Sequence, residues 1–129
     1  MTSKKIFDRL STLAKGLQFP SESEFPLEPF LWESTTLLPA NILHRANKPA
    51  IAPIEAIALQ EFFAPVTDER EWYDDDERAI AQRFRDLEME ISALENVQVF
   101  KVGQVEIDVY IVGAIDLDLV GLKTTVIET

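Results

Sequence analysis

Residues 97–111, VQVFKVGQVEIDVYI, contain the strongest fold signal in this chain of 129 residues. Apolar and polar residues alternate on both sides of the Gly-Gln pair at 103–104, which is typical of two strands joined by a tight turn. The second strand is predicted to place one set of side chains on one face: Val105, Ile107, Val109 and Ile111. Its other face is predicted to hold Glu106, Asp108 and Tyr110. The sequence therefore predicts a hairpin here.

A long amphipathic helix is predicted just before this hairpin, over residues 75–94. Its apolar residues recur every three or four positions, and they are Ile80, Phe84, Leu87, Ile91 and Leu94. The acidic run at 74–77 lies at the N-terminal end of this helix, where the helix dipole favours negative charge. After the hairpin, residues 122–127 are predicted to form a final strand.

The first half of the chain is predicted to be less regular. A helix is expected at the start, with Ser3 as its cap and Gly16 at its end. Its apolar positions are Ile6, Leu10, Leu13 and Leu17. Residues 25–33 are predicted to form an edge strand, because two prolines there cannot donate ladder hydrogen bonds. A short helix starting at Pro39, an extended piece over 53–57 and a short helix ending before Pro65 complete the prediction. With no repeat or low-complexity linker, residues 1–129 are expected to form one domain.

Composition narrows the class of function. The 47% share of hydrophobic residues is enough for one core. Twelve basic against 23 acidic residues give a net charge of −11, which repels phosphate, so direct nucleic-acid binding and binding to anionic membranes are not expected. A basic protein is the expected partner. The N-terminus lacks the continuous apolar stretch of a secretory signal, and the chain has no cysteine, so a cytoplasmic location is expected.

Catalytic chemistry is weakly represented, and we predict that the protein is not an enzyme and needs no cofactor. His44 is the only histidine and is expected to face solvent on a short helix; no G-x-S-x-G nucleophile motif or phosphate-binding loop is present. The acids at 74–77 are the residue type that binds Mg²⁺ or Ca²⁺, but the run lacks the alternating pattern of a calcium loop. Glu106 and Asp108 are either a catalytic carboxylate pair or the polar face of a strand.

Two acidic segments do suggest a binding surface. Ser21-Glu22-Ser23-Glu24 lies between Pro20 and the Phe-Pro pair at 25–26, so its carboxylates are expected on a stiffened loop. Glu71-Trp72-Tyr73 places aromatic residues in the acidic stretch 68–77. Trp72 either packs under the following helix or is an aromatic anchor for a basic partner.

Four segments of the chain resemble the nuclease A inhibitor family. They are GLQFPSESEFP with FLWE in 16–33, EWYDDDE at 71–77, VGQVEIDVYIVG at 102–113 and VIET at 126–129. The resemblance implies an α+β fold, a single-domain α/β/α sandwich with a largely antiparallel central sheet. It also implies a cytosolic inhibitor of a sugar-non-specific, Mg²⁺-dependent endonuclease, bound one-to-one at the nuclease active site.

The resemblance also implies which residues bind the nuclease. By position, the loop glutamate of the family falls on Glu22, its tryptophan on Trp72 and its C-terminal threonine on Thr129. Glu71 stands where the family pattern has aspartate, and Glu24 belongs to the same acidic loop. Glu22 and Thr129 are expected to approach the Mg²⁺ of the partner, while the protein has no metal of its own and is a monomer when free. The alternative is an acidic interaction module for another basic protein, without inhibitory activity.

Overall fold

The centre of the molecule is a five-stranded antiparallel sheet. The computed structural model describes residues 2–48 and 52–128. Along the chain the strands of this sheet are β3 (Glu28–Trp32), β4 (Ile54–Ile57), β5 (Glu95–Val102), β6 (Glu106–Ile115) and β7 (Asp118–Ile127). Their spatial order is β3-β7-β6-β5-β4. A separate two-stranded sheet pairs β1 (Gln18–Phe19) with β2 (Phe25–Pro26).

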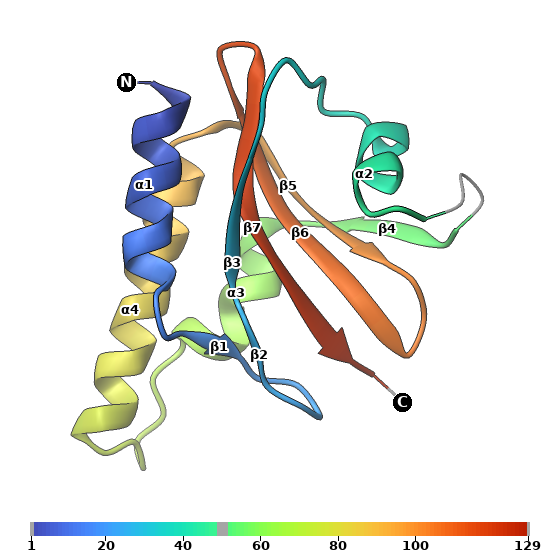
Figure 1. Cartoon of the computed structure of the whole chain (residues 1–129). Helices are drawn as coiled ribbons and strands as arrows, with labels where there is room; N and C mark the ends of the chain where they lie inside the picture. The colour runs from blue at the N-terminus through green and yellow to red at the C-terminus, as the bar shows by residue number, and fades with distance from the viewer. Residues whose placement is uncertain (1, 49–51, 129) are drawn as a thin grey trace.

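Helices cover both faces of the five-stranded sheet (Figure 1). The helices are α1 (Ser3–Ala14), α2 (Pro39–Arg45), α3 (Leu59–Thr67) and α4 (Asp75–Ser92). Buried residues of α1, α3 and α4 form one core with Val109 and Ile111 of β6. Ile42 and Leu43 of α2 form a second core with Tyr110 of β6. The predicted α/β/α arrangement and antiparallel sheet are thus confirmed. No helix within the described parts of the chain is long and apolar enough to cross a membrane.

The predicted hairpin is present as β5 and β6, but its turn is longer than expected. Val105 is 56% exposed and has a φ of 58°, so it belongs to the turn and not to the apolar strand face. β6 also pairs with β7 over ten residues, and β7 begins at Asp118 instead of 122. Gly121 lies inside β7, where an added Cβ would collide with the Ile111 carbonyl oxygen, so this glycine permits a close approach of β6.

Two helices differ in detail from the predictions. α3 continues through Pro65 to Thr67. Pro65 removes only the hydrogen bond to the Glu61 carbonyl, and Glu61 is exposed, so water can replace that bond. α1 is capped by the Thr2 hydroxyl, which accepts from the Lys5 amide at 3.3 Å, and not by the predicted Ser3.

α4 follows the prediction closely, ending at Ser92 instead of 94. The exception is its first apolar position. Ile80 is 49% exposed, and the neighbouring Ala81 is buried in its place.

Candidate functional site

Three segments that are far apart in the sequence lie toward the same end of the molecule (Figure 1). They are the loop 20–24 between β1 and β2, the connection 68–74 between α3 and α4, and the end of β7 at 126–128. The Ile127 amide donates to the Ser21 hydroxyl at 3.1 Å, which joins the loop to β7. Glu24 of the loop and Tyr73 of the connection line the same hollow. The predicted site residues in the described ranges, Glu22, Glu24, Glu71 and Trp72, all belong to these segments.

The acidic loop is organised by Ser21. The Ser21 hydroxyl donates to the Ser23 carbonyl at 2.6 Å, and the Ser21 amide donates to the same oxygen at 3.1 Å. The hydroxyl also accepts from the Ile127 amide, so it uses its donor and an acceptor position at once. Glu22 and Glu24 therefore extend from a closed turn that is tied to a sheet strand. Sequence reasoning missed this role of Ser21, although the Ser-x-Ser spacing is typical of a turn closed by a side chain.

The end of β7 is fixed on a second side. The Glu128 amide donates to the Val105 carbonyl at 2.8 Å, and Lys101 Nζ lies 2.8 Å from Glu128 Oε1. Hydrogen bonds thus hold the backbone and the side chain of Glu128. Thr129 itself, a predicted site residue, lies outside the described residues.

Trp72 lies on the surface of the connection 68–74. It is 75% exposed, which rules out the interpretation that it packs under α4. Its ring meets the Tyr73 ring edge-on, with centroids 6.4 Å apart. The Tyr73 amide donates to the Arg70 carbonyl at 3.0 Å and closes the turn that presents Trp72. Glu71, beside it, is exposed as well. An indole exposed in this way is available to a partner.

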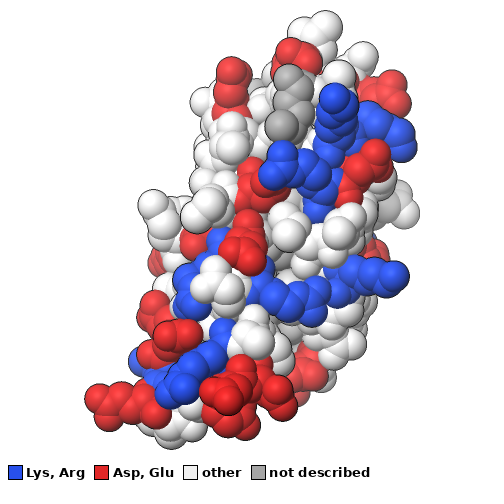
Figure 2. Space-filling view, turned by 90° about the vertical axis from the view of Figure 1, so that its left-hand side faces the viewer, with Lys and Arg blue, Asp and Glu red and all other residues white. Residues whose placement is uncertain are grey.

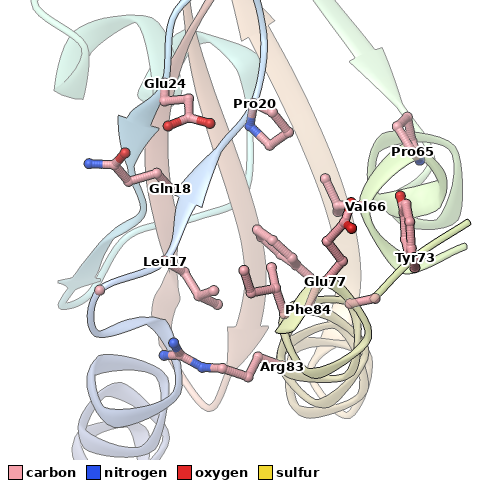
Figure 3. Close-up of a pocket in the computed structure, with 13 residues that line it drawn as sticks. Leu17, Gln18, Pro20, Glu24, Pro65, Val66, Tyr73, Glu77, Arg83 and Phe84 are labelled. Atoms are coloured by element: carbon pink, nitrogen blue, oxygen red, sulfur yellow. The ribbon is translucent and has the colours of Figure 1, made fainter. Parts of the chain in front are cut away.

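A hollow of about 380 Å³ lies between the acidic loop and this connection (Figure 3). Its floor is apolar and consists of Leu17, Val66, Ala81 and Phe84. Glu24 and Glu77 line it from two different elements, the loop and α4. This end of the molecule therefore combines carboxylates with apolar surface.

A comparison with known protein families identifies the same family that the four sequence segments resemble. The family model described as Nuclease A inhibitor-like protein matches residues 4–129. The chain belongs to this family. The match covers nearly the whole chain, including the loop, the connection and the end of β7. A search of curated proteins found no match.

Acidic residues are concentrated at this end of the nuclease A inhibitor-like fold. Residues 68–77 hold seven acidic side chains and one arginine. Figure 2 shows acidic side chains gathered at the lower end of the α1–α4 side, with lysine and arginine more frequent above them. The charge is therefore not spread evenly over the molecule, and a basic partner would be attracted to this end.

The acids at 74–77 have a structural role in this family member. The Asp74 side chain accepts from the Glu77 amide at 2.8 Å, and the Glu77 side chain accepts from the Asp74 amide at 3.2 Å. This reciprocal pair is a capping box, which satisfies two amides at the start of α4. Within the described ranges, no group of three or more histidine or acidic side chains is arranged to hold a metal ion.

The alternative catalytic pair on β6 also has a structural explanation. Asp108 lies 3.8 Å from Lys48 Nζ, and Glu106 is exposed at the start of the strand. Burial raises the pKa of the neighbouring Tyr110 to about 12, and the charge of Asp108 adds to this effect. His44 is exposed on α2, as predicted. Membership of an inhibitor family favours the interpretation of these side chains as surface and packing groups.

Proposed function

We propose that this protein inhibits a Mg²⁺-dependent, sugar-non-specific endonuclease by binding its active-site groove one-to-one. The observation that carries the proposal is that the acidic loop is hydrogen-bonded to the end of β7 and shares a hollow with the turn that presents Trp72. Family membership supplies the class of partner.

The physical argument rests on the charge of the substrate. A nuclease groove must be basic to hold phosphate, and the groove of this class contains a divalent cation. Glu22 and Glu24 present carboxylates from a loop that is closed by hydrogen bonds, so little conformational entropy is lost when they bind. They imitate the charge of a nucleic acid, but they contain no phosphodiester to be cleaved.

Glu22 and Thr129 are the residues proposed to approach the Mg²⁺ of the partner. Mg²⁺ in proteins keeps several waters and takes one or two carboxylates, so two such groups are sufficient. The Ser21–Ile127 hydrogen bond fixes the Glu22 loop relative to the strand that leads to Thr129. Glu71 and Trp72 would then bind the rim of the groove, with Trp72 as the anchor.

We further propose that the free protein is a cytoplasmic monomer that binds neither nucleic acid nor membranes directly. Its net charge of −11 disfavours both of those surfaces.

Titration into a non-specific Mg²⁺-dependent nuclease digesting plasmid DNA tests the proposal. Cleavage should disappear at one equivalent of inhibitor. Glu22→Arg should weaken inhibition by about 2–5 kcal/mol, because it reverses a charge in the centre of the interface.

The matched control is Glu33→Arg, which makes the same change in net charge. Glu33 is exposed and directly follows β3, at the end of that strand away from the acidic loop. Reversing its charge should therefore weaken inhibition by less than about 1 kcal/mol. Glu90 on α4 would not serve as a control, because its carboxylate lies 2.9 Å from Arg9 and reversing its charge would also break this ion pair. A tight complex without loss of cleavage would favour the acidic interaction module instead. Equal losses from the two reversals would mean that only net charge matters.

A further inference from the structure

The hollow between the acidic loop and α4 has a lining suited to one kind of side chain. At about 380 Å³ it lies at the small end of the range for ligand sites, which is about 300–1,000 Å³. It is lined by Glu24 of the acidic loop and by Tyr73 of the connection 68–74, but the family comparison assigns no role to it.

Its apolar part is continuous from floor to rim. Leu17 and Phe84 are almost fully buried beneath it, while Ile80 on the rim is 49% exposed. Tyr73 adds one half-buried aromatic ring. An exposed isoleucine beside an aromatic ring, above a buried apolar floor, is a surface that gains from being covered by an aliphatic or planar group.

Its charged part is formed by Glu24 and Glu77, whose side chains come from different elements (Figure 3). Only one oxygen of Glu77 is used in the capping box, where Oε1 accepts from the Asp74 amide. Arg83 also lines the hollow, but its Nη2 donates to the carbonyls of Leu13 and Lys15 at the end of α1. The guanidinium of Arg83 is therefore turned toward α1 and leaves the two carboxylates for an incoming cation.

We propose that this hollow receives an arginine side chain of the nuclease. The proposal rests on the proposed function, because it takes the nuclease as the partner. The methylene stem of arginine would cover the apolar floor, and its guanidinium charge would be attracted by the carboxylates of Glu24 and Glu77 on the two sides of the hollow. A basic groove that binds the acidic loop would thus also donate one side chain to this protein.

Removing the two charges without changing shape tests the proposal. The double variant Glu24→Gln, Glu77→Gln keeps the capping box, because glutamine serves at that position as well as glutamate. The matched control is Glu33→Gln, Glu95→Gln, which removes two charges at exposed positions that do not line the hollow. The first variant should weaken inhibition at least about tenfold and the second less than about twofold, with equal melting temperatures.

A measurement without the nuclease gives an independent result. N-acetyl-arginine amide, added to the ¹⁵N-labelled protein, should shift the amide resonances of Tyr73 and Ile80. N-acetyl-citrulline amide, a neutral compound of the same shape, should not shift them, and the Glu24→Gln, Glu77→Gln variant should respond to neither.

The outcomes separate this proposal from the proposed function. If the wild-type protein inhibits, and the two double variants inhibit equally, the arginine site is wrong while the inhibitor function stands. Equal shifts from the arginine and citrulline compounds, or no shift from either, would also overturn the site. A wild-type protein that neither binds nor inhibits the nuclease overturns both.

Discussion

One hydroxyl group, that of Ser21, determines how the acidic loop is presented. It is the shared partner of the Ser23 carbonyl within the loop and of the Ile127 amide in β7. The loop cannot shift relative to the sheet without losing the hydrogen bond from Ile127, while the Ser23 bond holds the turn itself closed. Ser21 therefore acts as a positioning residue for Glu22.

Ser21→Ala should weaken inhibition about fivefold, because one net hydrogen bond is worth about 1 kcal/mol. The Ile127 amide should exchange its hydrogen faster, since it loses its acceptor. Ser23→Ala is the matched control, because only the backbone of Ser23 takes part in the hydrogen bonds of this turn. Equal inhibition constants for the two variants would contradict the positioning role.

The two tryptophans of the chain have opposite environments. Trp72 is 75% exposed and contacts the Tyr73 ring. Trp32 is half-buried, with its ring centroid 4.2 Å from that of Phe30 and 5.6 Å from the Arg45 guanidinium. Trp72 is on the surface, where we propose that it binds the partner, and Trp32 is part of the fold.

Trp72→Ala should reduce binding to the nuclease by about 2 kcal/mol or more and leave the free energy of unfolding unchanged. Trp32→Ala should do the reverse, with a loss of about 2–3 kcal/mol in stability. Denaturant melts and inhibition assays on both variants check this. A Trp72→Ala protein with normal inhibition would remove the anchor role.

At the scale of the elements, helices with local start signals were predictable. The start of α4 was predicted because its acidic run and its periodicity are both local. The burial of Ala81 in place of Ile80 could not be predicted, since it depends on how α4 packs against α1 and α3. The predicted end of α3 before Pro65 was also wrong. A proline stops a helix when the hydrogen bond that it removes has no substitute, and at Pro65 water can supply one.

Strand β6 also has a feature that the local sequence could not predict. Alternation correctly assigned Ile107, Val109 and Ile111 to one face, but it cannot tell whether the other face meets water. α2 returns over that face and buries Tyr110 to 2% exposure. The short α2 has a weak sequence signal, so its effect on a strand sixty residues later was not predictable.

Burial of Tyr110 predicts a loss of stability in alkali. Its pKa is raised to about 12 in the folded protein, chiefly by burial, against about 10 in the unfolded chain. The unfolded state therefore releases this proton first, and stability that is complete below pH 10 declines as the pH rises toward 12. The loss is on the order of 3 kcal/mol, at about 1.36 kcal/mol for each of the two pKa units.

Denaturant melts across this pH range check the prediction. Tyr110→Phe should remove this part of the decline, whereas Tyr73→Phe, which changes the only other tyrosine, should retain it. Parallel curves for the wild type and Tyr110→Phe would show that other groups cause the alkaline loss.

At the scale of the whole molecule, the proposed binding segments could be picked out from the sequence, but their arrangement could not. The acidic loop and the Trp72 stretch are visible as local strings, with prolines and aromatics among carboxylates. The hydrogen bond that joins Ser21 to Ile127 spans 106 positions, and nothing local in the sequence indicates it. The hollow between Glu24 and Glu77 likewise exists only once the sheet has formed.

The uneven distribution of charge predicts electrostatically steered association. The rate constant for binding should fall at least severalfold between about 50 and 500 mM salt, as the Debye length shrinks from about 14 to about 4 Å. Stopped-flow fluorescence of the exposed Trp72 measures it directly. The dissociation rate constant should change much less. An association rate constant that is independent of salt would contradict a binding surface that imitates the charge of nucleic acid.

The position of β7 in the sheet has a consequence for synthesis of the protein on the ribosome. β7 lies between β3 and β6, yet it is the last of the described elements to be made. Within the sheet β3 pairs only with β7, and α1 packs on both β3 and β7. The first third of the chain therefore cannot complete its packing until the ten residues of β7 have been synthesised. At about 5–20 residues per second, this wait lasts several seconds or more, during which apolar side chains of α1 remain uncovered. A nascent chain that stalls before residue 118 would lack the strand that joins its two halves, and it would be a natural client for chaperones.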